Sequence, residues 1–157
     1  MAVVRFIVHR TCDNDNMISP DSRSEISDTL VLVVEDNLDV QEIIKMVLRL
    51  RRVRVIPASD GIEGLRLFRE HRGNLSMVLL DLLLLRMGGL ELAHQIRLED
   101  GNIPILIASG QMDDTVLDEF KCIPRVAFLH KPFTATELLK AVDDLSGPST
   151  TSSAPGA

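Results

Sequence analysis

Strand-like and helix-like segments alternate along most of this 157-residue chain, and this alternation limits its fold more than any other feature. Each strand-like segment is a short apolar run bounded by turn formers, which is typical of strands buried on both faces of a parallel sheet. The predicted strands are 29–34, 54–58, 76–81, 103–107 and 126–130, and the predicted helices are 39–50, 62–71, 90–97, 113–121 and 134–145. The pattern predicts an α/β fold, a doubly wound five-stranded parallel sheet with helices on both faces.

Composition excludes several classes of function. A hydrophobic content of 45% with 25% charged residues is typical of one globular domain with a single core. Aromatic residues make up 3%, and the net charge is −6, so we expect no direct contact with nucleic acid. No apolar run approaches the ~20 residues that cross a bilayer, so we expect no membrane insertion. Cys12 and Cys122 are far apart and match no zinc or redox spacing, so we expect reduced thiols in a cytoplasmic protein.

The two ends of the chain differ in composition from its centre. Residues 1–28 are mostly polar and predict a flexible N-terminal arm or linker, although residues 3–8 could add an edge strand or pack on a partner. Residues 147–157 are rich in Ser, Thr, Pro and Gly and predict a disordered tail. The folded domain is therefore expected at 29–146.

Chemically active side chains follow four of the predicted strands. Glu35 and Asp36 end the first strand, Asp81 the third, Ser109 the fourth, and Lys131 the fifth. In a parallel sheet these ends share one edge, which is where α/β proteins bind ligands. Crowded carboxylates need a cation, and a set of oxygen ligands without histidine suits Mg²⁺. The hydroxyl and the ammonium would then hold the oxygens of a phosphoryl group that arrives on Asp81.

With these strand ends in place, residues 29–145 resemble the receiver domain of two-component response regulators. Each matching piece is weak alone, but their order and separation are specific to that family. The pieces are Val31-Leu32-Val33-Val34-Glu35-Asp36-Asn37, Leu79-Leu80-Asp81, Met87-Gly88-Gly89-Leu90-Glu91-Leu92, Ile107-Ala108-Ser109-Gly110 and Lys131-Pro132-Phe133.

The resemblance implies a mechanism. Asp81 would accept a phosphoryl group from a histidine kinase or a histidine phosphotransfer protein, and Mg²⁺ would be held by Glu35, Asp36, Asp81 and the backbone carbonyl of Leu83. The resemblance also implies that Ser109 and Lys131 hold the phosphoryl oxygens and that Ser109 and Phe128 act as the switch. It implies a sheet order of 2-1-3-4-5 and a cis Lys131-Pro132 bond. The output would be a downstream protein partner, and phosphorylation-dependent dimerisation is one form it could take.

The chain has three departures from the family pattern, which involve four residues. Leu84-Leu85 replaces a frequent Met-Pro, so we expect a less rigid loop after Asp81. Gln41 replaces a frequent arginine on the first helix, which puts a typical surface contact in doubt. Leu83 places an apolar side chain beside the acceptor, and we hypothesise that it shields the acyl phosphate from water.

Purely structural roles for these residues, and other functions for the fold, stay open. Glu35 and Asp36 could cap a helix, Ser109 could be a turn serine, Phe128 could be a core residue, and Ile43 could be a docking residue or a plain exposed hydrophobe. A binding module of the same fold that signals without phosphate would be expected to lack an acid or the lysine. An aspartyl-phosphate hydrolase usually carries a second acid two residues after the nucleophile, where this chain has Leu83. We therefore expect a phosphoacceptor without external turnover, either free-standing or cut from a hybrid kinase.

Overall fold

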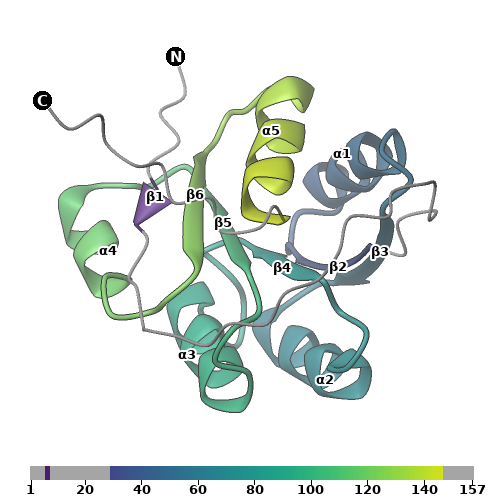
Figure 1. The fold of residues 1–157 in the computed structure, drawn as a ribbon. Coiled ribbons are helices and arrows are strands. Elements are labelled where there is room, and N and C mark those ends of the chain that lie inside the picture. The colour runs from purple at the N-terminus through teal and green to yellow at the C-terminus, as the bar shows by residue number, and fades with distance from the viewer. Residues whose placement is uncertain (1–5, 8–28, 147–157) are drawn as a thin grey trace, which may run out of the picture.

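The computed structural model describes residues 6–7 and 29–146, which form one sheet between two layers of helices (Figure 1). The predicted alternation is confirmed, with element ends that differ by one or two residues. In chain order the elements are β1 (Phe6–Ile7), β2 (Leu30–Val34), α1 (Leu38–Arg49), β3 (Arg54–Ala58), α2 (Gly61–His71), β4 (Met77–Leu80), α3 (Gly89–Glu99), β5 (Ile105–Ser109), α4 (Asp114–Glu119), β6 (Val126–His130) and α5 (Ala135–Ser146).

Five strands are parallel and have the predicted order. From one edge the sheet runs β3, β2, β4, β5 and β6, which is 2-1-3-4-5 when the parallel strands are counted along the chain. Pro57 lies in the edge strand β3, where its missing N–H breaks no inner ladder. In the middle of the sheet, β2, β4 and β5 are buried along their whole length, as expected for strands covered on both faces.

A sixth strand extends the sheet. β1 pairs antiparallel with β6, with Phe6 opposite Ala127 and Ile7 opposite Val126. An edge strand within residues 3–8 is one of the two options that the sequence allows, and the structure supports it. A sheet edge carries unpaired N–H and C=O groups, and β1 pairs some of those on β6. The rest of the predicted arm and the predicted tail lie outside the described residues.

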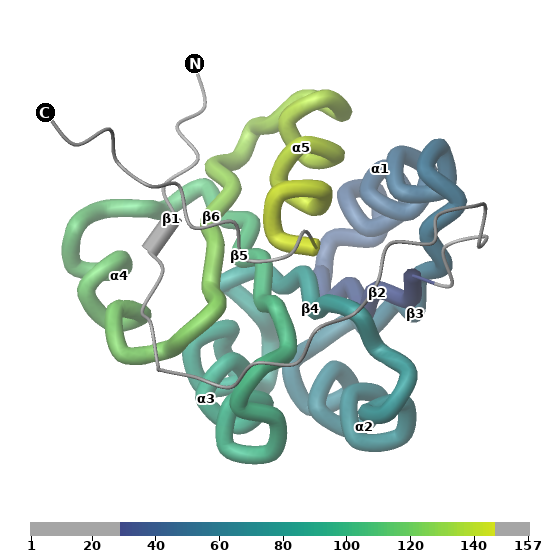
Figure 2. The backbone as a smooth tube through the Cα atoms, in the orientation of Figure 1, coloured from purple at the N-terminus to yellow at the C-terminus, as the bar shows by residue number. Residues whose placement is uncertain are grey.

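Helices cover both faces of the sheet (Figure 2). Alternate residues of each strand point to opposite faces, so Leu32 and Val34 belong to one buried cluster and Val31 and Val33 to the other. The first cluster includes residues of α2 and α3 with Leu117 of α4, and the second includes residues of α1 and α5. Two cores on one sheet leave the carboxyl ends of the strands as the place for polar side chains.

Local sequence signals set the starts of several helices. Asn37, Asp60 and Asp113 cap α1, α2 and α4 with side-chain oxygens that accept backbone N–H groups. At α5, the Thr134 amide donates to Glu137 at 2.7 Å and the Glu137 amide donates to Thr134 Oγ at 3.2 Å. This reciprocal pair confirms the predicted capping box.

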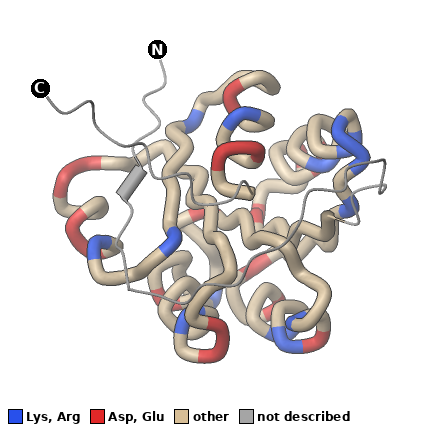
Figure 3. Tube along the Cα trace, in the orientation of Figure 1, with Lys and Arg blue, Asp and Glu red and all other residues tan. Residues whose placement is uncertain are grey.

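Charged residues lie mostly on helices and connecting loops, whereas β2, β4 and β5 contain none (Figure 3). Charges that come close to the centre of the sheet therefore do so just beyond the strand ends. Within the described residues, no helix is long and apolar enough to cross a membrane.

Candidate functional site

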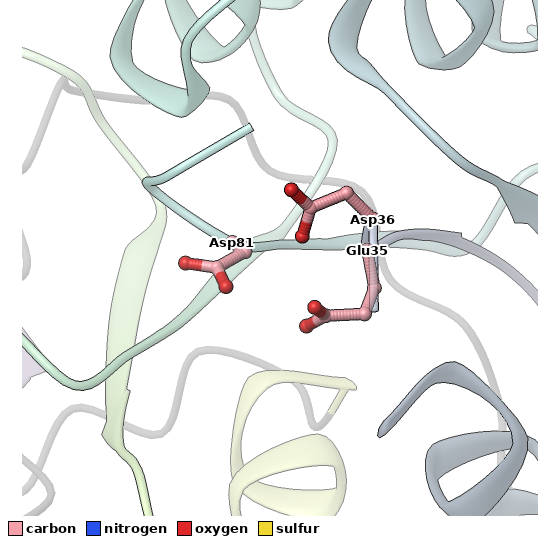
Figure 4. A group of neighbouring side chains, drawn as sticks. All are labelled: Glu35, Asp36 and Asp81. Carbon is pink, nitrogen blue, oxygen red and sulfur yellow. The ribbon is translucent and has the colours of Figure 1, made fainter. Parts of the chain in front are cut away.

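Two neighbouring strands bring three acids together. Glu35 and Asp36 directly follow β2, and Asp81 directly follows β4, which pairs with β2 in parallel through Val34 and Leu80. One carboxylate oxygen of each acid lies within 4.8 Å of the others. Figure 4 shows the three carboxylates directed into the same space from two backbone segments. The predicted convergence of the acids is thus present in the structure.

Lys131 brings a positive charge to the same place. It follows β6, and its ammonium lies 2.6 Å from Asp81 Oδ2 and 2.7 Å from Glu35 Oε2. Its backbone amide donates to the carbonyl of Ser109 at 2.8 Å, and the Lys131-Pro132 bond is cis as the resemblance implied. The ammonium therefore bridges two acids that come from two different strands.

Burial strengthens these charge interactions. Glu35 is 2% exposed and Asp81 9% exposed, so little water screens them. Burial raises the pKa of Glu35 above its ordinary value, although the hydrogen bond and charge of Lys131 oppose that shift. Burial alone would lower the pKa of Lys131, but its hydrogen bonds to Asp81 and Glu35 outweigh burial and raise it. The ammonium therefore keeps its proton between the two acids.

Ser109 lies on β5, the strand beside the acceptor strand β4, and Phe128 lies on β6, the next strand outward in the sheet. Ser109 ends β5, is fully buried, and accepts a hydrogen bond from the Gln111 amide at 3.2 Å. The Phe128 ring lies in the core at 1% exposure and packs edge-on against Phe120, with the ring centroids 5.5 Å apart. The structure thus holds Phe128 in its inward position.

Leu83 contributes both backbone and side chain next to Asp81. Its amide donates to Asp81 Oδ1 at 3.1 Å, so the loop after β4 helps to orient the acceptor carboxylate. Its side chain is 62% exposed. The apolar group is therefore on the surface beside the acid rather than in the core.

Gln41 is a supporting residue that the sequence did not reveal. We expected it to alter a surface contact, but it is 5% exposed, and its side-chain amide donates to the carbonyls of Glu35 and Ala58 at 3.1 and 2.9 Å. It therefore ties α1 to the ends of β2 and β3. The only signal in the sequence was a polar residue one turn before Ile44 on the buried side of the helix.

The acids fit a hard divalent cation. Three carboxylates meet here, and oxygen ligands of this kind suit Mg²⁺ better than soft or nitrogen-preferring metals. Within the described residues this is the one group of three or more potential metal ligands, and it contains no histidine or cysteine. Glu35 accepts a hydrogen bond from the Asn37 amide at 3.2 Å, and Asn37 rather than Glu35 or Asp36 caps α1. Helix capping therefore does not explain the acidic pair.

Comparison with known proteins agrees with the site. The chain is 29% identical over 119 residues to a putative two-component response regulator of Arabidopsis thaliana, a match that covers 76% of this chain and 19% of that one. It is 33% identical over 111 residues to the response regulator MprA of Mycobacterium sp. (strain KMS), covering 69% of this chain and 46% of the relative. The chain thus spans less than half the length of these relatives.

Solved structures agree as well. A response regulator receiver domain protein of Clostridium thermocellum has a TM-score of 0.70 and 26% identity, and the match covers 75% of this chain and 94% of that one. Residues 31–143, most of the chain, match the response regulator receiver domain. The chain therefore belongs to the response regulator receiver domain family.

Proposed function

We propose that the chain is a phosphoacceptor of a two-component signalling system and that Asp81 receives a phosphoryl group from a phosphohistidine. Phosphoryl acceptance is the general function of the receiver family, whose members act as switches rather than as enzymes with external turnover. The observation that carries the assignment is the contact of 2.6 Å between Lys131 and Asp81, beside Glu35 and Asp36. The Lys131 ammonium thus provides a positive charge next to the carboxylate that would act as the nucleophile.

The geometry of the site supports the following transfer. A carboxylate oxygen of Asp81 attacks phosphorus, the bond between phosphorus and the imidazole nitrogen breaks, and its electron pair returns to the ring. Lys131 neutralises charge on the phosphoryl oxygens, and the Ser109 hydroxyl donates to one of them. Glu35, Asp36, Asp81 and the carbonyl of Leu83 would hold Mg²⁺. When bound there, Mg²⁺ would supply positive charge that stabilises the negative charge of the transfer.

The structural change caused by phosphorylation would be transmitted from Ser109 to Phe128. Ser109 Oγ accepts from the Gln111 amide, and its O–H would donate to a phosphoryl group on Asp81, which would draw the residue toward the acceptor. Movement of the loop after β5 then alters the packing around Phe128, which lies on the neighbouring strand β6. We infer that the surface near α4 and β6 changes its affinity for a downstream protein or for a second copy of the domain.

The phosphoryl donor would be a histidine kinase or a histidine phosphotransfer protein. Ile43 on α1 is 56% exposed and offers an apolar contact for such a donor. We propose that residues 29–146 form the acceptor domain and that this domain acts in the cytoplasm.

The decisive experiment is incubation with Mg²⁺ and a small-molecule phosphodonor, followed by mass spectrometry. We expect a mass increase of one phosphoryl group that is labile to base and is lost in Asp81→Asn. Asp144→Asn, which changes an exposed acid of α5, is the matched control and should be modified like the parent. Equal modification of Asp81→Asn and the parent would contradict the assignment. Steady release of phosphate from an excess of donor would favour a hydrolase instead.

A further inference from the structure

The loop that follows Asp81 is attached at its far end to the start of α2. Arg86 forms an ion pair with Asp60, the residue that caps α2 through the Glu63 amide. The Gly61 amide donates to the carbonyl of Leu85 at 3.4 Å. A Cβ on Gly61 would overlap the Met87 carbonyl oxygen and lie 2.7 Å from Met87 Cβ. Helix and loop backbone therefore meet so closely that only glycine fits.

The ion pair is not an ordinary surface contact. The Asp60 side chain is only 11% exposed, whereas the Arg86 side chain reaches it from the surface and is 60% exposed. Arg86 has a φ of 65°, a backbone conformation that costs energy for a residue with a Cβ. The hydrogen bond from the Arg86 guanidinium lowers the pKa of Asp60, so the contact favours the charged form of the acid. The contact therefore holds a strained residue in place.

The near end of the same loop orients the acceptor. The Leu83 amide donates to Asp81 Oδ1 at 3.1 Å, and the Gly89 amide donates to the Leu82 carbonyl at 2.9 Å. Residues 82–88 contain no proline that would fix the backbone by itself. The position of the Leu83 amide and carbonyl therefore depends on where the rest of the loop is anchored.

We propose that Asp60 and Arg86 are a positioning pair. They hold the loop after β4 in the conformation in which the Leu83 amide donates to Asp81 Oδ1. The proposal rests on the proposed function for its Mg²⁺ and phosphoryl consequences, but not for its effect on the loop. Without the pair, the loop samples other conformations, the Leu83 amide leaves Asp81 Oδ1, and its carbonyl leaves the metal position. Neither residue touches the reacting atoms.

The test compares Asp60→Asn and Arg86→Ala with the parent. Asparagine can still cap α2, so Asp60→Asn removes the ion pair without removing the cap. Arg86→Ala keeps a Cβ at the strained position. Arg66→Ala is the matched control, because it breaks a different ion pair of α2, with Glu70, which is exposed on both sides and does not involve the loop. Three quantities are measured: amide hydrogen exchange of residues 82–88, the Kd for Mg²⁺ by calorimetry, and Tm.

We expect faster exchange across the loop and a Kd for Mg²⁺ about tenfold higher in both variants, the order found for partners that support metal ligands. Arg66→Ala should match the parent, Arg86→Lys should recover most of the affinity, and the double variant should be no worse than either single one. Parent-like loop exchange in both single variants would overturn the proposal, as would a parent-like Kd.

The outcomes separate this inference from the proposed function. If the parent takes up no phosphoryl group on Asp81, the function fails while loop exchange still decides the role of the pair. If the parent is phosphorylated and both single variants match it in loop exchange, Kd and phosphorylation rate, the function stands and the pair has no positioning role. A weaker Mg²⁺ affinity at unchanged Tm supports positioning, because a purely structural role would lower Tm and leave the Kd unchanged.

Discussion

The ammonium of Lys131 lies 2.6 Å from the carboxylate of Asp81, although 50 residues separate the two in the chain. The same ammonium lies 2.7 Å from Glu35, which is 96 residues away. One cation thus compensates acids from two strands, and water screens it little, since the lysine side chain is 21% exposed. We therefore expect metal binding by these acids and the stability of the fold to be coupled at this residue.

Lys131→Ala should destabilise the metal-free protein and increase the effect of Mg²⁺ on stability. Removing one partner leaves buried acids uncompensated, and we expect a loss of about 2 kcal/mol in the free energy of unfolding, less than for a fully buried pair. Urea unfolding with and without Mg²⁺ measures both effects. Lys140→Ala, which breaks an exposed pair with Asp144, should change little. An identical response of Lys131→Ala and the parent to Mg²⁺ would contradict the coupling.

Gln41→Leu should weaken both the fold and the metal site. The substitution leaves the carbonyls of Glu35 and Ala58 without the buried amide that now donates to them, at a cost of about 2 kcal/mol. Glu35 then loses a support next to its carboxylate, so the Kd for Mg²⁺ should rise. Unfolding curves and calorimetry measure the two effects. A variant with parent-like stability would show that water replaces the amide.

Acidification should weaken Mg²⁺ binding earlier than an ordinary glutamate would predict. Burial raises the pKa of Glu35 above its ordinary value of 4.5, so protons compete with the metal for this ligand at a higher pH. The free energy of unfolding of the metal-free protein should depend on pH in the opposite direction. A raised pKa favours the folded state while Glu35 is protonated, and that contribution to stability is lost as the pH rises through the pKa of Glu35 in the folded state. Calorimetric titration with Mg²⁺ at a series of pH values gives the first profile.

Glu35→Gln is the control for that profile. The variant should bind Mg²⁺ more weakly at neutral pH and should lack the part of the pH dependence that Glu35 causes. A decline that sets in at the same pH in the parent and in Glu35→Gln would assign the titration to another group.

Leu83→Asn should shorten the lifetime of the phosphorylated protein. Leu83 places an apolar side chain beside Asp81, and we expect its replacement by a polar one to admit water to the acyl phosphate and speed its loss about threefold. Leu85→Asn is the matched control, since Leu85 is on the same loop and is exposed to a similar degree, 64% against 62%. The phosphate remaining over time after removal of the donor gives both rates. Equal lifetimes for Leu83→Asn and the parent would remove the shielding role.

The converging acids could be predicted from the sequence for one physical reason, whereas the strand order was implied by the resemblance to the receiver family. In a parallel sheet every carboxyl end lies on one edge, so a residue that directly follows a strand has its position set by topology alone. Asp81, Glu35, Asp36 and Lys131 are all such residues, and the structure brings them together. The capping box at Thr134 was also predictable, because both of its partners lie within one helical turn.

Tertiary structure alone decided the contacts that support this edge. Gln41 meets Ala58 across 17 residues and Arg86 meets Asp60 across 26, and no local pattern marks either pair. Both depend on how a helix packs on the sheet and where a loop returns, which is determined by the burial of many apolar side chains at once. The residues that could perform the chemistry were thus predictable from the sequence. Packing between distant segments decided which side chains hold them in place.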